Sequence, residues 1–231
     1  RLASLGNLSA GVAHEINQPL TALKIKVDSY LYWMELEKEP TREKYIETLE
    51  FVSEQAGRID QIIRHMRSLI RQDSHREPVP VGVNEVVQSA LSLLDEQLMS
   101  HRIRIEKTWG VDIPAILSQP ALLEQVVINL VVNAMNTLDQ LGGETKLIRV
   151  STRREEQGGC SIIVRDNGPS VPVELLDHVF DPFFGSRRGL DNPGLGLSIT
   201  ENIVTGLGGA ISVSNHEEGG CQFRVYLPQA Q

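Results

Sequence analysis

The stretch that decides the fold of the N-terminal region covers residues 13–20 and reads Ala13-His14-Glu15-Ile16-Asn17-Gln18-Pro19-Leu20. It lies within residues 2–37, where apolar side chains recur at spacings of three and four. This periodicity predicts one long amphipathic helix. A second periodic segment follows the break at Glu39-Pro40, with Thr41 as its expected N-cap, and runs to about residue 71. The sequence therefore predicts an antiparallel helical hairpin.

Each helix of such a hairpin carries an apolar face that one neighbour cannot cover. We therefore expect a homodimer in which two hairpins form a four-helix bundle. The polar stretch that follows contains Pro78 and Pro80, and this composition is typical of a linker. These patterns predict a hairpin domain at 1–73, a linker at 74–82 and a second domain at 83–231.

The second domain alternates between strand and helix patterns. Apolar and β-branched stretches predict strands at 102–109, 115–117, 146–153, 160–166, 210–215 and 222–227. Helical patterns cover 84–100, with Asn84 as the expected cap, and then 119–141, 174–178 and 196–207. Because 119–141 is apolar almost all round, we expect it to be buried. The predicted fold class is a helical hairpin followed by an α/β sandwich domain, with one mixed sheet and helices against one of its faces.

Composition and charge narrow the classes of partner. A formal net charge of -8 over 231 residues argues against nucleic acid or an anionic membrane surface as the main partner. No apolar run reaches the ~20 residues of a membrane span, and no signal-peptide pattern is present. Because the chain begins at Arg1, we expect a longer protein in which any membrane anchor precedes this residue. Cys160 and Cys221 lack metal-ligand spacing and are expected to be free thiols in a reducing compartment.

His14 and Glu15 combine an imidazole with a carboxylate on one helix. A carboxylate beside an imidazole can take the Nδ1 proton and leave Nε2 as a nucleophile. Pro19 has no N–H, so the carbonyl of Glu15 loses its helical partner and a kink is expected close to the histidine. Taken alone, the same pair also describes a histidine and a glutamate on a solvated helix surface, and the sequence downstream decides between the two interpretations.

Three patterns downstream indicate a ligand site. Asn129 and Asn133 are four residues apart, so they share one face of the buried helix, where amides need a polar ligand or a neighbouring loop as partner. Asp166 ends a strand before a Gly-Pro turn, where it is either a ligand acceptor or part of an ordinary Asp-Asn-Gly turn. Gly194 and Gly196 open a helix, and glycines there let backbone N–H groups approach an anion.

Residues 8–20 resemble the H-box of sensor histidine kinases, in the variant of the nitrogen-regulation and dicarboxylate-transport sensors. The resemblance implies that His14 is autophosphorylated, that Glu15 acts as its base, and that the receiver domain of a response regulator takes the phosphoryl group. Many members carry Thr or Asn at the fourth residue after the histidine, where it positions a water for dephosphorylation. This chain has Gln18 there, whose amide can also hold a water. The resemblance further implies a cytoplasmic kinase core within a membrane-associated full-length protein.

The second domain resembles the ATP-binding domain of the same kinases, a fold shared with gyrase, a heat-shock chaperone and mismatch-repair ATPases. The resemblance implies that Asn133 coordinates Mg²⁺, that Asn129 lies near the phosphates of ATP, and that Asp166 accepts a bond from the exocyclic amine of adenine. It implies further nucleotide contacts from the turn, the lid and the glycine-rich block, at Gly168, Phe180, Arg187, Arg188, Gly194, Leu195, Gly196 and Leu197. The chain departs from the family pattern at Asn136, Ser170, Gly185, Arg187, Asn192 and Cys221.

Two other functions remain open from the sequence. The same fold serves hydrolytic ATPases and ATP-gated clamps, but these carry a glutamate where this chain has Asn129. A degenerate kinase that acts as a scaffold without phosphorylating a histidine would account for the departures from the family pattern. Four residues with implied roles in the kinase reaction are retained and favour the kinase: His14, Glu15, Asn133 and Asp166.

Overall fold

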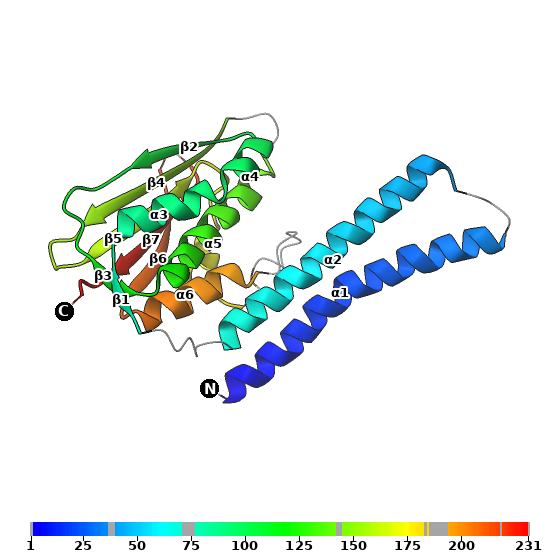
Figure 1. Cartoon of the computed structure of the whole chain (residues 1–231), viewed down its shortest axis with the longest axis horizontal. Coiled ribbons are helices and arrows are strands. Elements are labelled where there is room, and N and C mark those ends of the chain that lie inside the picture. Colours follow the sequence, from blue (N-terminus) through cyan, green and yellow to red (C-terminus); the bar gives the residue numbers. More distant parts are fainter. Residues whose placement is uncertain are drawn as a thin grey trace. The chain divides into compact units, whose positions relative to one another are not determined.

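The computed structural model describes residues 2–36, 40–70, 77–141, 145–182, 184, 194–217 and 219–230, without the side chains of 2–15, 61 and 64–70. Within these residues the chain divides into two compact units, Arg1–Asp73 and Ser74–Gln231. The first is helical and the second is an α/β unit, as the sequence predicts (Figure 1).

Unit one is an antiparallel pair of helices, α1 (Leu2–Glu35) and α2 (Arg42–Ile70). The Thr41 hydroxyl accepts the N–H of Lys44 at 3.4 Å, so Thr41 is the N-cap of α2 that the sequence predicts. α1 continues through Pro19 as a single helix. The two helices are joined near the turn by the Tyr30 hydroxyl, which donates to the Lys44 carbonyl at 2.6 Å.

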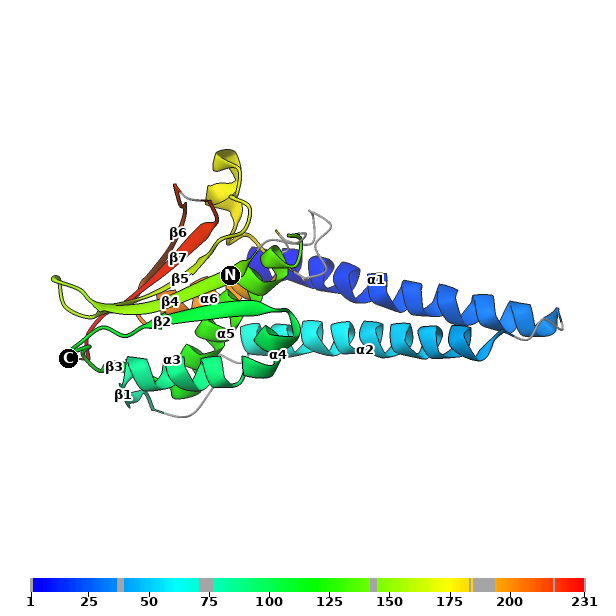
Figure 2. The same ribbon diagram turned by 90° about the horizontal axis from the view of Figure 1, so that it is seen from above.

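Unit two is built on a five-stranded sheet with the order β2-β4-β5-β7-β6. The strands are β2 (Ile103–Thr108), β4 (Lys146–Arg154), β5 (Cys160–Asp166), β6 (Ala210–Asn215) and β7 (Cys221–Leu227). β2 pairs with β4 in parallel and the other pairs are antiparallel, so the sheet is mixed, as predicted. Helices α3 (Val83–Ser92), α5 (Pro120–Leu138) and α6 (Gly196–Gly206) cover one face of the sheet (Figure 2).

The core of unit two lies between this face and the three helices. Side chains of α5 and the central strands are fully buried there, among them Leu123, Leu130, Leu138, Ile148 and Ile162. By length and composition α5 is apolar enough to cross a membrane, although polar residues interrupt its sequence and no uninterrupted apolar run is that long. Its contacts with α3, α6, β4 and β5 identify it instead as a core helix, whose apolar side chains pack against these neighbours.

Two expectations for the start of this unit are wrong. Residues 84–100 form two helices, α3 and α4 (Asp95–Ser100), and Asn84 does not cap the first, whose N-cap is Gly82. The Asn84 side chain instead donates to the Gly110 carbonyl at 3.2 Å and accepts the Thr152 hydroxyl at 2.7 Å. It is unavailable to the helix end because it links α3 to the sheet.

Part of the expected linker is a strand. Val79–Val81 forms β1, which pairs antiparallel with β3 (Ile116–Ser118) in a separate two-stranded sheet. The alternation of Val79, Pro80 and Val81 buries the last valine, and an edge position tolerates the missing N–H of proline. Of the remaining expected linker, residues 74–76 lie outside the described residues.

Candidate nucleotide and phosphoacceptor sites

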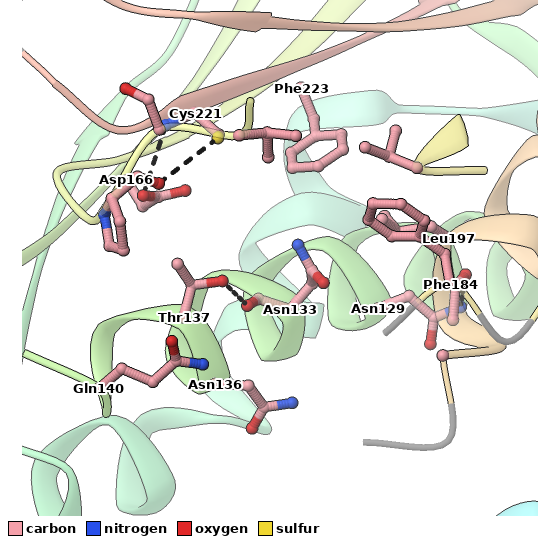
Figure 3. Close-up of a pocket in the computed structure, with 16 residues that line it drawn as sticks. Asn129, Asn133, Asn136, Thr137, Gln140, Asp166, Phe184, Leu197, Cys221 and Phe223 are labelled. Carbon is pink, nitrogen blue, oxygen red and sulfur yellow. Dashed lines mark hydrogen bonds between the residues drawn. The ribbon is translucent and has the colours of Figure 1, made fainter. Parts of the chain in front are cut away.

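A cavity of about 350 Å³ opens in unit two between α5, the loop after β5, the start of α6 and the start of β7 (Figure 3). Its volume lies in the range that small-molecule sites occupy. It is lined by Asn129, Asn133, Asn136, Thr137, Gln140, Asp166, Pro169, Ser170, Val171, Val179, Phe184, Gly194, Gly196, Leu197, Cys221 and Phe223. The fold thus brings together, from three separate segments, six of the nucleotide residues that the resemblance implies: Asn129, Asn133, Asp166, Gly194, Gly196 and Leu197.

Asp166 ends β5 at one wall of the cavity and is 3% exposed. Its Oδ1 atom accepts the N–H of Gly168 at 2.8 Å and the N–H of Cys221 at 3.4 Å, the second of which is drawn in Figure 3. Oδ2 receives neither bond. Burial raises the pKa of this carboxyl, although the two amide donors act against that rise. Asp166 therefore offers a buried acceptor to a ligand that carries a donor group.

Two glycines leave room around this carboxylate. A Cβ on Gly168 would lie 2.9 Å from Asp166 Oδ1 and 3.1 Å from Thr137 Cγ2. A Cβ on Gly220 would collide with the carbonyl oxygen of Asp166, and Gly220 also has a φ of +83°. Gly168 is buried and does not line the cavity. It forms the turn after β5 and donates its N–H to the Asp166 carboxylate.

The two asparagines of α5 have different surroundings. Asn129 Nδ2 donates to the Gly196 carbonyl at 3.1 Å and to the Thr200 hydroxyl at 3.3 Å, so it holds the start of α6. Of the two partners expected for a buried amide, a ligand or a neighbouring segment, Asn129 has the second. Asn129 also lines the cavity. The Asn133 carboxamide lies at the cavity (Figure 3) and has no hydrogen-bond partner among the described residues. Asn133 is therefore available to a ligand.

The lid region comprises residues 180–194, and the structure describes only its two ends. Phe180 packs edge-to-face on Phe223, with ring centroids 6.4 Å apart, behind the wall to which Phe184 contributes. At the other end Gly194 has a φ of +66°, and Leu195 is fully buried as the N-cap residue of α6. The lid residues between them, Ser186, Arg187, Arg188 and Asn192 included, lie outside the described residues.

The phosphoacceptor candidates lie on α1 in unit one. His14 and Glu15 are within the helix, and their side chains lie outside the described residues. Gln18 follows one turn later and is exposed. The roles of these three residues remain predictions.

Sequence reasoning missed several residues of the cavity. Thr137 and Gln140 line it with Asn133 because positions i, i+4 and i+7 share a helix face, a signal that was available in the sequence. Val171 lines it from the loop after β5, and its backbone is bound by Asn215, which is 44 residues away. No local pattern links those two positions.

Comparison with known proteins gives matches over both units. The phospho-acceptor domain of histidine kinases, His Kinase A, matches residues 4–75. The histidine kinase-, DNA gyrase B- and HSP90-like ATPase family matches residues 118–231.

Individual relatives match nearly the whole chain. The sensor histidine kinase ZraS of Escherichia coli K12 is 30% identical over 228 residues, which are 99% of this chain and 46% of ZraS. The C4-dicarboxylate transport sensor protein DctB of Pseudomonas aeruginosa is 29% identical over 231 residues, 98% of this chain and 36% of DctB. The chain thus spans less than half the length of either relative.

Among solved structures, that of histidine kinase ThkA in complex with response regulator protein TrrA is similar over 100% of this chain and 63% of that one, with 24% identity and a TM-score of 0.75. This similarity shows the fold. The two family models and the relatives ZraS and DctB agree with the H-box and the ATP-site motifs. The chain belongs to the sensor histidine kinase family.

Proposed function

We propose that this chain is the kinase core of a sensor histidine kinase, which phosphorylates His14 with ATP and passes the phosphoryl group to an aspartate of a response regulator. The observation that carries the proposal is the buried Asp166 acceptor in a cavity of unit two. It occurs in the same chain as a match to the phospho-acceptor domain that includes His14. One unit supplies the donor site and the other the acceptor.

The cavity fits ATP at its base end. The unused Oδ2 of Asp166 can accept the exocyclic amine of adenine, while Val171 and Phe223 supply apolar wall. At the opposite end Gly194 and Gly196 line the cavity at the N-terminus of α6, where backbone N–H groups and the helix dipole favour phosphate. Arg187 and Arg188 in the lid are proposed as further phosphate ligands.

Asn133 fits the role of a magnesium ligand. Its carboxamide is at the cavity and has no partner among the described residues, and amide oxygen is a ligand that Mg²⁺ accepts. No cluster of three or more His, Cys, Asp or Glu side chains occurs in the described part of the chain. Such a site suits a cation that takes most of its other ligands from phosphates and water, and Mg²⁺ bound there would neutralise charge on the phosphates.

The chemistry at α1 then follows from the His14-Glu15 pair. Nε2 of His14 attacks the γ-phosphorus, the bond to the bridging oxygen of ADP breaks, and Glu15 takes the Nδ1 proton. Positioning and charge neutralisation supply most of the rate enhancement. We assign to Gln18, one turn further along α1, the holding of water for removal of phosphate from the partner.

The partners follow from the same assignment. We propose a homodimer through the α1–α2 hairpin, and a response regulator as the second partner, because ThkA was solved in complex with one. We place this kinase core in the cytoplasm, since both cysteines are free and buried, as expected for a reducing compartment.

A hydrolytic ATPase is the second candidate function. Among the described residues that line the cavity, Asp166 is the only carboxylate, and its Oδ1 is already bonded to two backbone N–H groups. Since no second carboxylate is there to activate a water, the cavity favours transfer to His14 over hydrolysis.

Labelling with [γ-³²P]ATP tests the proposal. Wild-type protein should form a phosphoprotein that is stable in base and labile in acid, and His14→Gln should not label. His101→Gln, which removes an imidazole that does not line the cavity, is the matched control and should label normally. Equal labelling of wild type and His14→Gln would contradict the proposal, and rapid ADP release that survives His14→Gln would support the hydrolase.

A further inference from the structure

Asn215, the last residue of β6, makes an unusual pair of bonds outside the cavity lining. Its Nδ2 donates to the Val171 carbonyl at 2.6 Å, and its Oδ1 accepts the Val171 N–H at 3.0 Å. One side chain therefore satisfies both backbone groups of a single loop residue, as a neighbouring strand would.

The loop residue held in this way is part of the cavity wall. Pro169, Ser170 and Val171 line the cavity between β5 and the 3-10 helix η1 (Val173–His178), and they belong to neither element. The wall thus depends on a side chain from β6, and the segment begins three residues after Asp166.

Cys221 adds a second connection between the same partners. Its thiol lies 3.8 Å from the Pro169 carbonyl and 3.6 Å from Asn215 Oδ1, while its backbone N–H donates to Asp166. Burial and the nearby Asp166 charge raise the pKa of this thiol, so it keeps its proton and can donate. The loop, the end of β6 and the Asp166 carboxylate are therefore joined in one hydrogen-bonded group.

We propose that Asn215 is a positioning residue for nucleotide binding, which fixes the Val171 wall beside Asp166 and so sets the affinity for the base end of ATP. This role rests on the proposed function, because it assigns the Asp166 end of the cavity to adenine. Asn215 acts through Val171 and does not itself line the cavity.

The carboxamide is well suited to this role because it donates and accepts at once. An ionised aspartate at this position would accept the Val171 N–H but would face the Val171 carbonyl without a proton to donate. A protonated aspartate has the same shape as asparagine and restores both bonds. The pKa of the introduced carboxyl should rise because of partial burial and the facing carbonyl oxygen.

The first test compares two asparagines that make similar pairs of bonds. Asn215→Ala and Asn84→Ala each remove from unit two a carboxamide that both donates and accepts, with the Cys221 thiol as an additional donor to Asn215. Asn84, however, links α3 to the sheet and does not line or support the cavity. Equilibrium binding of ATP to the full chain should weaken roughly fivefold to thirtyfold in Asn215→Ala and stay unchanged in Asn84→Ala, although both lower the melting temperature. In autophosphorylation, KM for ATP should rise while the maximal rate is kept.

The possible outcomes distinguish the role of Asn215 from the proposed binding of ATP. Wild-type protein that binds no ATP would overturn both. ATP binding that Asn215→Ala leaves unchanged, or that Asn84→Ala weakens equally, would overturn the role of Asn215 alone.

The second test uses Asn215→Asp and pH. We expect its affinity for ATP, divided by that of wild type at each pH, to recover as the pH falls from about 8 to about 5.5. The neighbouring titratable groups Asp166, Cys221 and His216 are present in both proteins, so the ratio isolates the introduced carboxyl. A ratio that does not change with pH contradicts the proposal, because a defect of packing alone would not depend on that proton.

Discussion

The two units of the molecule differ in how far each completes its own core. In the α/β unit, side chains of α5, β4, β5 and β7 are fully buried against one another. In the hairpin, the large apolar side chains of the described part are mostly open, among them Leu20 at 51%, Val27 at 42%, Leu31 at 55%, Met34 at 54% and Leu49 at 67% exposed. The α/β unit can therefore fold around its own core, whereas the hairpin needs a further apolar surface.

The positions of the exposed apolar side chains on α1 indicate which face of the hairpin a second apolar surface would cover. Leu20, Val27, Leu31 and Met34 are separated by seven, four and three residues, so they form one stripe along the helix. The side of α1 next to this stripe carries Tyr30 and Lys26, which contact α2. A second copy of the hairpin that packs on the stripe would bury it, which is the four-helix bundle proposed above.

The largest effect should come from charging that stripe. Val27→Glu with Leu31→Glu removes four apolar side chains from a two-fold interface, which costs roughly 6 kcal/mol or more and weakens the dimer by about 10⁴-fold. Light scattering should then show a monomer, with the melting transition of the α/β unit kept. Met99→Glu is the matched control, because Met99 is 79% exposed but belongs to α4 of the complete unit. A double variant that remains dimeric would contradict the proposed interface.

The next largest effect should come from Asp166, where one substitution is expected to weaken ATP binding and to raise the stability of the α/β unit. Asp166→Asn keeps an oxygen for the Gly168 and Cys221 N–H groups but loses the charge that a donor on adenine would meet. ATP binding should fall roughly tenfold to a hundredfold. The stability of the unit should rise at neutral pH, because burial makes ionisation of Asp166 unfavourable.

The sign of this stability change can be checked by pH. The folded pKa of Asp166 is raised above its unfolded value, so its ionisation lowers stability as the pH rises from below the ordinary carboxyl range through the raised pKa. Melting curves should show that the gain from Asp166→Asn is present above this window and disappears below it. A variant that is less stable than wild type at neutral pH would mean that the charge itself supports the fold.

The sequence predicts the regular elements of both units better than it predicts the cavity wall. Apolar periodicity identifies α1, α2, α5 and the five strands of the main sheet, because burial on one face dictates that pattern. It misses β1, because three residues with a central proline carry too little alternation to distinguish a strand from a linker. It also extends α3 through Leu93 and Leu94, whose apolar character continues the periodicity after the helix has ended.

The site divides along the same line. Asp166 and Asn133 stand out as candidates because a strand end and a helix face are local features, while the role of each is implied by the family resemblance. The bond between Asn215 and Val171 cannot, because it joins a strand end to a loop 44 residues away and depends on the completed sheet. The residues next to Asn215 in the sequence do not indicate this bond, which forms only when β6 and β7 pair in the sheet.

A smaller effect should distinguish the two asparagines of α5. Asn129→Ala removes the bonds to Gly196 and Thr200, so it should cost roughly 1–3 kcal/mol of stability. Asn133→Ala loses no described hydrogen bond of its side chain and should leave the melting temperature nearly unchanged, while the Mg²⁺-dependent rate of autophosphorylation falls. Thermal melts and a magnesium titration of the labelling rate measure both. The assignment of Asn133 fails if its variant melts as early as Asn129→Ala and labels as wild type.

The smallest effect should come from a glycine-to-alanine change in the hairpin, and the same change in the α/β unit supplies the contrast. Gly57 lies inside α2, and a Cβ there would meet nothing within 4 Å in the described residues. Gly57→Ala should therefore stabilise the hairpin by roughly 0.5–1 kcal/mol, because alanine loses less backbone entropy in a helix. Gly220→Ala should instead destabilise the α/β unit, since a Cβ there collides with the Asp166 carbonyl at a positive φ. If Gly57→Ala loosens the dimer in light scattering, the open space beside Gly57 belongs to the partner's helix, and the incomplete surface of the hairpin extends from the α1 stripe onto α2.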